Sequence, residues 1–416
     1  AKVDITPLES IPLAGFSHRS GSSLGVLRPI YARFFLIKKS GQLYLLITAD
    51  LIWWGNIVLK PIQELLKKYG IQSDHILLHA THNHSGPQTS DEFTPSLGCP
   101  DHFYLTTLIE KVDEGFKQAL ENLEPVSLER GDGVWMAGVN RRKMKKGQVV
   151  MEPNLKGAND PAVTVIQFKR KDGTTKGLLV HATCHPTTTD ENFISSEFPG
   201  YAMDTLENCL LEEGVVAGFL QGFCANIRPF LVKEEQFYRG TNADVERIGQ
   251  ELVDVVLEIM KSKMEPINIG DVYLVTKNIK LPFSYVPGHD ELVEKAKERG
   301  VIGEWSKLLI KKIMIPVEAN LEINFFSLSE KLAFLTANAE MVVEYGFYVR
   351  NLIGKQVLPI GYTNGIIGYV PTAVQLDEGG YEPIDSTKYF GMPSHFTKEI
   401  ELLIKSAFQD LKIDRK

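Results

Sequence analysis

The sequence predicts an α/β fold in which mixed β-sheets are covered by helices. Three observations lead to this prediction. Strand-like and helix-like segments alternate through most of the 416 residues. Hydrophobic residues make up 44% and charged residues 23% of the chain, which is the composition of a globular protein with a large core. No internal repeat or Pro/Gly/Ser-rich linker divides the chain, so residues 1–416 are expected to form a single domain.

The first third of the chain is expected to hold three strands and two helices. Residues 31–39 and 43–52 are apolar, β-rich runs around a Lys-Ser-Gly-Gln turn. Apolar residues at helical spacing predict helices over 57–70 and 101–123. The apolar run at 74–80 predicts a short buried strand between these helices.

Terminal signals accompany the two helices. Gly70 is expected to end the first helix, and Asp101 is expected to cap the amino end of the second.

Further along, residues 162–184 predict two strands joined by a turn at Asp172-Gly173. The remaining predicted elements are a helix over 241–263, two strands within 321–338, a helix over 339–353 and a final helix over 395–411.

Three long polar loops are expected at 85–101, 140–161 and 228–241. Loops longer than about a dozen residues are uncommon in compact domains unless they serve a function or are disordered. Each of these loops begins beside one of the chemical motifs described below. We therefore expect the loops to shape a substrate site.

Charge and apolar patterning exclude several classes of partner. Lys and Arg number 45 and Asp and Glu number 52, which gives a net charge of −7, whereas nucleic-acid binding needs a basic surface. No run of about 18 apolar residues predicts a transmembrane helix. The first residues resemble neither a signal peptide nor a transit peptide, so a cytoplasmic location is the default expectation, with secretion left open. The sequence does not indicate the oligomeric state.

The cysteines predict no metal or disulfide framework of their own. The four residues are widely spaced along the chain: Cys99, Cys184, Cys209 and Cys224. This spacing is typical of neither a zinc ribbon nor a redox motif, and four thiols are too few for a disulfide scaffold in a chain of this length. The chemistry is therefore expected to come from other side chains.

The most distinctive motif is Ala-Thr-His-Asn-His-Ser-Gly-Pro at 80–87, which follows the predicted strand 74–80. In extended backbone, His82 and His84 would project to the same face. Neutral imidazole is the commonest metal ligand, and two on one face suit zinc or a similar divalent ion. The alternative is a pair of loop histidines that form local hydrogen bonds.

Two further polar residues follow predicted strands. His185 precedes Pro186, which disfavours the α conformation and fixes the histidine at a strand end. Glu340 either reaches into a cleft or stabilises the first turn of the next helix through the helix dipole. Together with His82, these two residues would supply three protein ligands. A catalytic zinc ion needs three protein ligands and an open position.

Together, these motifs resemble the N-terminal catalytic domain of the neutral, non-lysosomal ceramidase family. The stretches that carry the resemblance are AKVDITP near the start, ATHNHSGP at 80–87, VNR at 139–141, HPT at 185–187, LQGFCANIRP at 220–229, NAE at 338–340, and GYV followed by GGYE within 368–382. The resemblance implies the family's α/β fold. It also implies a zinc-dependent amidase that cleaves an N-acyl bond.

The resemblance implies roles for seven side chains. Four of them correspond to the residues around the family's zinc ion: His82, His185, Glu340 and Tyr369. Tyr381 matches a second catalytic tyrosine, and His84 and Arg141 match positions that bind polar groups of the substrate. As donors, these three would stabilise the oxyanion that forms when metal-activated water attacks an amide. The alternative for both tyrosines is ordinary packing.

The chain departs from the family pattern at Arg228, which stands where ceramidases carry a serine in a Gly-Asp-x-Ser-Pro segment. A serine nucleophile is therefore not expected. Arg228 presents a planar charged fork suited to carboxylate or phosphate, so we expect it to bind substrate. The alternative is an ion pair with Glu234 or Glu235. Gln88-Thr89 also replaces a pair of glycines, and we expect no counterpart of the family's C-terminal immunoglobulin-like domain.

These observations predict a zinc-dependent hydrolase that cleaves an N-acyl amide bond by metal-activated water. The substrate is expected to be a small-molecule or lipid-like acyl amide, smaller or more polar than ceramide, because Arg141, Arg142 and Arg228 favour polar or anionic ligands. The basic run at 141–146 is alternatively a solvated loop. Two other functions remain open: a metal-dependent esterase or lactonase on the same scaffold, and a non-catalytic metal-containing binding protein.

Overall fold

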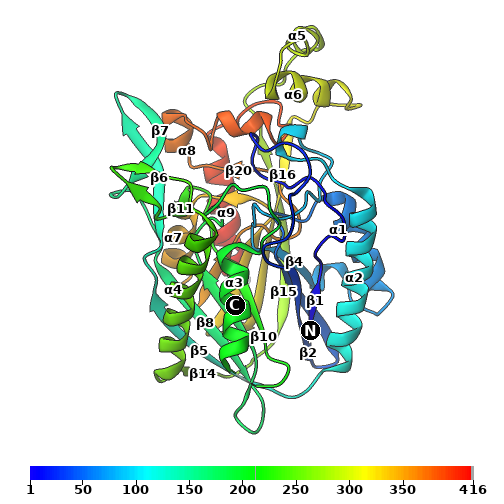
Figure 1. Ribbon diagram of the computed structural model, residues 1–416, viewed down its shortest axis with the longest axis vertical. Helices are drawn as coiled ribbons and strands as arrows, with labels where there is room; N and C mark the ends of the chain where they lie inside the picture. The colour runs from blue at the N-terminus through cyan, green and yellow to red at the C-terminus, as the bar shows by residue number, and fades with distance from the viewer. Residues whose placement is uncertain (211, 414–416) are drawn as a thin grey trace.

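Three main β-sheets and the helices that cover them form the mixed α/β fold that the sequence predicts (Figure 1). The computed structural model describes residues 1–210 and 212–413. Within these residues, none of the helices is both long and apolar enough to cross a lipid bilayer.

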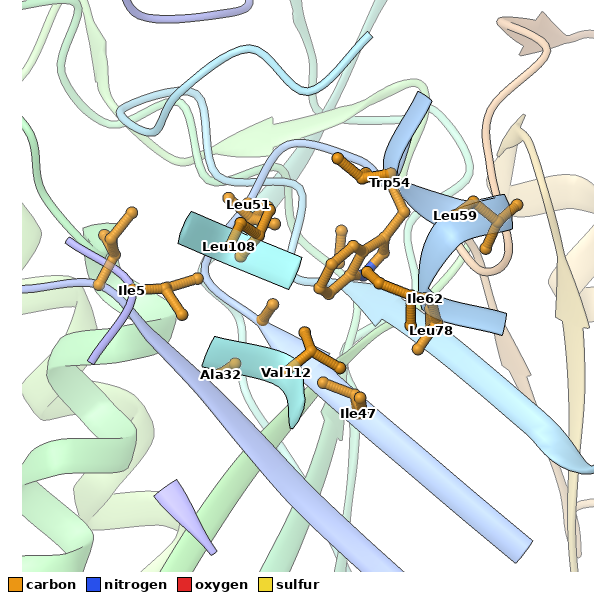
Figure 2. Close-up of a cluster of buried hydrophobic side chains, with 14 of the residues drawn as sticks. Ile5, Ala32, Ile47, Leu51, Trp54, Leu59, Ile62, Leu78, Leu108 and Val112 are labelled. Atoms are coloured by element: carbon orange, nitrogen blue, oxygen red, sulfur yellow. The ribbon is translucent and has the colours of Figure 1, made fainter. Parts of the chain in front are cut away.

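The first sheet has the strand order β1-β2-β3-β4, and helices α1 and α2 pack against it. Its antiparallel β2–β3 pair and its parallel β3–β4 pair bury a cluster that includes Trp54, Leu78 and Val112 (Figure 2). Asp101 caps α2 as predicted, because its carboxylate accepts a hydrogen bond from the backbone N–H of Tyr104 at 2.8 Å. The bounds are Lys2–Asp4 (β1), Tyr31–Lys39 (β2), Gln42–Ala49 (β3), Ile76–Ala80 (β4), Asn56–Lys67 (α1) and His102–Glu121 (α2).

The second sheet has the order β10-β9-β8-β5-β14, in which only β9 and β10 pair parallel. The predicted strand–turn–strand at 162–184 is the antiparallel β8–β9 pair of this sheet. Helices α3 and α4 pack against the sheet through apolar residues such as Phe198, Phe219 and Val256. The bounds are Ser127–Val134 (β5), Ala162–Lys169 (β8), Thr175–Ala182 (β9), Val216–Gln221 (β10), Glu265–Ile267 (β14), Glu197–Leu210 (α3) and Asn242–Lys261 (α4).

The third sheet has the order β15-β16-β17-β19, with β17 and β19 parallel. Tyr345 of α7 and Phe408 of α9 pack together in the core beside this sheet. A central cluster joins the three sheets through residues such as Phe35, Leu179 and Phe334. Helices α5 and α6 project from the body at the top of Figure 1. The bounds are Tyr273–Pro282 (β15), Glu318–Ser329 (β16), Leu332–Ala337 (β17), Val357–Ile360 (β19), His289–Lys295 (α5), Val301–Ile310 (α6), Val343–Leu352 (α7) and Glu399–Ile413 (α9).

Strands outside the three main sheets occupy two segments that the sequence analysis treats as loops. The prediction of a loop at 140–161 is wrong, because β6 and β7 form an antiparallel hairpin there. The predicted loop at 228–241 contains parts of three short strands, one of which pairs with β6. The bounds of the short elements are Gly138–Lys145 (β6), Gln148–Asn154 (β7), Ile227–Pro229 (β11), Val232–Lys233 (β12), Gln236–Phe237 (β13), Glu340–Met341 (β18), Tyr369–Val370 (β20), Ala373–Glu378 (α8), and the 3-10 helices Ser73–His75 (η1), Pro95–Leu97 (η2) and Asp385–Lys388 (η3).

The carboxyl ends of strands from all three main sheets meet in one region. The backbone N–H of Gly361, after β19, donates to the carbonyl of Gln221 at the end of β10 at 3.1 Å. The N–H of Ala80 at the end of β4 donates to the carbonyl of Tyr362, after β19, at 3.0 Å. The motifs that follow these strands are therefore brought together.

Glu340 lies in a strand and not in a helix. The predicted helix over 339–353 is wrong at its start, because Glu340 belongs to β18 and α7 begins at Val343. β18 pairs parallel with β20, and Glu340 lies opposite Tyr369 in this register. The alternative in which the carboxylate stabilises the first turn of a helix is therefore wrong.

Candidate metal centre and active site

His82 and His185 are in contact although they are 103 positions apart in the sequence. Their Nε2 atoms are 2.9 Å apart and both side chains are buried. The Nδ1 atom of His82 lies 3.0 Å from the carbonyl oxygen of Ile52. The Nδ1 atom of His185 lies 2.9 Å from the carbonyl oxygen of Cys224. Because a carbonyl oxygen only accepts hydrogen bonds, both Nδ1 atoms carry the proton. The two Nε2 atoms therefore face each other and are the ring atoms left to bind a metal ion.

This pair of nitrogens suits a cation. Burial, and to a lesser extent the neighbouring His82, lowers the pKa of His185 to about 4, so this ring is neutral at pH 7. With its proton on Nδ1, the neutral ring has none to place between the two Nε2 atoms. Two nitrogen atoms at 2.9 Å repel each other unless a proton or a metal ion lies between them. Neutral imidazole nitrogens bind divalent metal ions in this way.

Glu340 adds a negative charge to the same point. Its Oε2 atom lies 3.3 Å from Nε2 of His82 and 3.4 Å from Nε2 of His185. The residue is only 2% exposed, and across residues 1–210 and 212–413 no Lys or Arg side chain forms an ion pair with it. A buried carboxylate without a cation is strongly unfavourable. A bound metal ion would compensate this charge.

His84 brings a third imidazole to the cluster. Its Nε2 atom is 3.1 Å from Nε2 of His82, and one nitrogen from each of the three histidines lies within 4.8 Å of the others. Its ring packs against Phe16, with the centroids 5.0 Å apart. Burial and the neighbouring imidazoles lower the pKa of His84 well below its usual value, which favours the neutral, metal-binding form.

Four of the separations between the candidate ligand atoms match those of a tetrahedral metal site. With Zn–N distances of about 2.0–2.1 Å, the ligand atoms of such a site lie about 3.3 Å apart. The four contacts that involve Nε2 of His82 or His185 range from 2.9 to 3.4 Å. The chemistry of the set also fits, because it combines neutral nitrogens with one carboxylate. The residues present therefore suit a zinc-like divalent ion.

The backbone brings His82 and His84 together by a different route from the one expected. The expectation of extended backbone is wrong, because β4 ends at Ala80 and His82 has a φ of +66°. A non-glycine residue rarely adopts this left-handed conformation. The two imidazoles still converge, with ring centroids 4.7 Å apart and ring planes at 90°.

A second polar group lies beside Glu340 and is built around Arg141. The Nη2–H of Arg141 donates to the phenol oxygen of Tyr369 at 3.1 Å, and its Nε–H donates to Glu382 at 2.7 Å. The guanidinium also lies over the rings of Tyr369 and Tyr381, 5.6 and 5.5 Å from their centroids. Burial raises the pKa of Tyr369 well above its usual value, so the phenol keeps its proton. Charged and neutral donors therefore gather beside the histidine cluster.

A family model for the N-terminal part of neutral/alkaline non-lysosomal ceramidases matches residues 1–247, more than half of the chain. The chain belongs to this ceramidase family. The sequence analysis selected eight candidate site residues from this ceramidase pattern, and the structure shows where each of them lies. Seven of them gather in the two polar groups described above: His82, His84, Arg141, His185, Glu340, Tyr369 and Tyr381.

Solved ceramidase structures share the fold of this chain. The neutral ceramidase from Pseudomonas aeruginosa superposes with a TM-score of 0.78 at 20% sequence identity, over 99% of this chain and 72% of that chain. A ceramidase complexed with C2 gives a TM-score of 0.79 at 18% identity, over 100% of this chain and 74% of that chain. No curated protein sequence matches the chain. At these identities the likeness concerns the fold alone.

Arg228, which the sequence analysis expects to bind substrate, is buried with 7% of its surface exposed. The expected alternative, an ion pair with Glu234 or Glu235, is not found in the described part of the chain. Glu235 pairs instead with Lys143 at 3.7 Å. The guanidinium of Arg228 lies over the ring of Phe237, 4.6 Å from its centroid.

Sequence reasoning missed three residues of the site: Tyr362, Cys224 and Glu382. The Tyr362 hydroxyl lies 3.2 Å from the Cys224 sulfur and 3.5 Å from Oε2 of Glu340. A usable signal existed for Tyr362, because it follows the apolar run of β19 just as His82 follows β4. Another existed for Glu382, which is the residue directly after Tyr381 in the ceramidase-like stretch.

Proposed function

We propose that this protein is a zinc-dependent hydrolase that cleaves an N-acyl amide bond. Membership of the ceramidase family supports a hydrolase with a lipid-like amide substrate, and the buried histidine cluster supports a metal site. The observation that carries the proposal is the convergence of the Nε2 atoms of His82 and His185 beside the Glu340 carboxylate. A divalent ion at this point would bind both nitrogens and balance the buried carboxylate.

In this proposal the metal is held by His82, His185 and Glu340, and His84 is close enough to complete the set. A divalent ion at this point would polarise an acyl carbonyl and increase the acidity of water. The resemblance implies that His84 is an oxyanion donor. Its Nε2 atom, 3.1 Å from that of His82, favours a ligand role instead. Tyr369 was assigned as a further ligand, and we propose that it acts beside the metal through its phenol group.

The polar residues beside the proposed metal site would orient the substrate and stabilise the charge that forms on it. Negative charge develops on the carbonyl oxygen when the acyl carbon is attacked. Arg141 and the Tyr369 and Tyr381 hydroxyls would supply donors for this oxygen from buried and partly buried positions, where such hydrogen bonds are stronger than in water. Glu382 holds the Arg141 side chain through its 2.7 Å hydrogen bond, so the donor is in place before substrate binds.

Two positions that could have supplied a nucleophile are unsuited to that role. Arg228 occupies the family's serine position, and burial raises the pKa of the Cys224 thiol well above its usual value, so the thiol is unreactive. Water is therefore the attacking group that the proposal retains.

Metal content and amide hydrolysis test the proposal together. The purified protein is expected to contain about one zinc ion per chain and to release the amine from a short N-acyl amide. Removal of zinc with a chelator should abolish this activity, and added zinc should restore it. His82→Ala and His185→Ala should lose both metal and activity, whereas His289→Ala, at an exposed histidine of α5, should keep both.

Two results would refute the proposal. One is full metal content in both the His82 and the His185 variants. The other is a zinc-loaded protein that hydrolyses esters or lactones but no amide in a matched panel, which would favour the esterase alternative.

A further inference from the structure

Arg228 is a buried cation that lacks an anion. Four arginines are buried in the described part of the chain, and three of them have carboxylate partners: Arg33, Arg141 and Arg142. In the same part of the chain, no carboxylate forms an ion pair with Arg228, and no oxygen accepts a hydrogen bond from it. A buried charge is normally paired, because its removal from water is unfavourable. The structure therefore leaves a guanidinium fork with its donors unused.

An aromatic ring and further positive charges lie near the guanidinium of Arg228. Phe237 covers one side of the guanidinium, at 4.6 Å from the ring centroid. Burial, together with the positive charges of Arg239 and Arg141, lowers the pKa of Arg228 to about 9. At neutral pH the side chain is still charged. An anion that reached it would be attracted by more than one arginine.

The fold places Arg228 beside the proposed catalytic groups. Arg228 lies on β11, opposite Val139 on β6. Side chains two residues apart on a strand point to the same face, so Arg141 shares this face with Val139 and Arg228. Arg141 reaches from there to the Tyr369 hydroxyl at 3.1 Å. One residue before Arg228, the carbonyl of Ile227 accepts a hydrogen bond from the His185 N–H at 3.4 Å.

We propose that Arg228 binds a carboxylate on the substrate, so that the amides cleaved by this protein are anionic N-acyl amides, of which N-acyl amino acids are one class. This inference rests on the proposed function. One guanidinium balances one negative charge, and its planar fork matches the two oxygens of a carboxylate. Arg141 and Arg142 are less suited to this task, because both are already bound to Glu382 at 2.7 Å.

A pair of amides with the same shape and different charge tests the proposal. N-hexanoylglycine carries the carboxylate on the amine side, and N-hexanoylisobutylamine is its neutral counterpart. The zinc-loaded wild-type protein should prefer the anionic amide by at least tenfold in kcat/KM. Because a hydrogen bond to a charged group is lost, Arg228→Gln should reduce this preference by about 10- to 100-fold. Arg228→Lys, which keeps the charge but not the fork, should retain part of it.

A control and a second pair complete the design. Arg247→Gln removes an arginine that is half-exposed on α4 and should leave the preference unchanged. The monopropylamide of glutaric acid, compared with a neutral amide of equal length, places the carboxylate on the acyl side. A preference that depends on Arg228 in either pair supports the proposal and shows which side carries the anion. Hydrolysis of all four amides with no such dependence overturns it, while the proposed function stands.

Binding separates this inference from the proposed function if no amide is hydrolysed. Calorimetry with N-hexanoylglycine should then show binding to the wild type that is at least tenfold weaker in Arg228→Gln and unchanged in Arg247→Gln. That result would support the carboxylate site although the amidase proposal had failed. Equal affinity for wild type and Arg228→Gln would overturn the inference.

Discussion

The imidazole of His82 lies against the phenol ring of Tyr362, with the ring centroids 3.9 Å apart and the ring planes inclined by 18°. Both residues have left-handed backbone, with φ of +66° for His82 and +55° for Tyr362. Such strain is on the order of 1–3 kcal/mol per residue and persists only where the surrounding structure enforces it. The stack therefore helps to fix the direction in which the Nε2 atom of His82 points.

Removing the Tyr362 ring should weaken metal binding. Tyr362→Ala is expected to lower zinc affinity by about 10- to 100-fold, as the loss of groups that orient a ligand does, and to destabilise the fold by about 3–5 kcal/mol. Tyr362→Phe keeps the stack and should retain metal. Tyr345→Ala removes another buried tyrosine that lies outside the cluster, so it should cost similar stability with unchanged zinc affinity. Equal zinc affinity in Tyr362→Ala and Tyr345→Ala would contradict the role of the stack.

Gly15 leaves room for His84. A Cβ atom at Gly15 would lie 2.3 Å from Nδ1 of His84, and its φ of +98° also disfavours other residues. Gly15→Ala should therefore displace the His84 ring and reduce metal occupancy and kcat together. Gly21→Ala is the matched control, because its φ is +75° and its Cβ would meet no atom within 4 Å. Gly21→Ala should therefore show only the effect of backbone strain, measured as a small decrease in Tm. Normal metal content in Gly15→Ala would exclude His84 from the ligand set.

Much of the candidate site was predictable because it follows strand ends. His82, His185 and Glu340 each come after an apolar run, and the fold brings the ends of β4, β9 and β17 together. The same logic failed at the start of α7, where helical spacing in 339–353 hid the short strand β18. A two-residue strand has no periodicity of its own, and its pairing with Tyr369 exists only in the folded chain.

The hairpin of β6 and β7 was missed for a related reason. Its outer half, which includes Lys143 and Lys145, is polar and lies outside the main core, so it carries few apolar residues to reveal a strand period. Glu382 was missed because its importance comes from two arginines 240 and 241 positions away. Contacts at such separation cannot be derived from local patterns.

Glu382 should be important for stability as well as for the position of Arg141. Its carboxylate binds both Arg141 and Arg142 at 2.7 Å and is 2% exposed. Glu382→Gln would leave two buried guanidiniums without this charge, so the free energy of unfolding should fall by about 3–5 kcal/mol. Glu378→Gln removes a half-exposed partner of Arg142 and should cost no more than about 1 kcal/mol. Denaturant unfolding of both variants checks this difference.

The same substitution should change the acid limb of the stability profile. Burial alone would raise the pKa of Glu382, but the charges of Arg141 and Arg142 hold it below its ordinary value of 4.5. A carboxyl group with a depressed pKa contributes stability above about pH 4.5, and this contribution is lost as the pH falls through the folded-state value. Between pH 5 and 3 the wild type should therefore lose more stability than Glu382→Gln. Equal losses of stability in the wild type and in Glu382→Gln over this pH range would show that the pKa of Glu382 is not lowered.

Arg228 is expected to reduce stability in the absence of substrate. Its pKa of about 9 in the folded protein is below the ordinary 12.5, so the charged form opposes folding at pH 7. Arg228→Met should therefore raise the free energy of unfolding, by about 1–4 kcal/mol if it behaves like other buried charges replaced by apolar residues. Arg33→Met should do the opposite, because it leaves the buried Asp50 without a cation and leaves Asp204 with Lys2 alone. N-hexanoylglycine should stabilise the wild type and not Arg228→Met, since only the wild type offers the anion a partner. A fall in Tm for Arg228→Met would mean that the guanidinium has a structural partner and is not free for substrate.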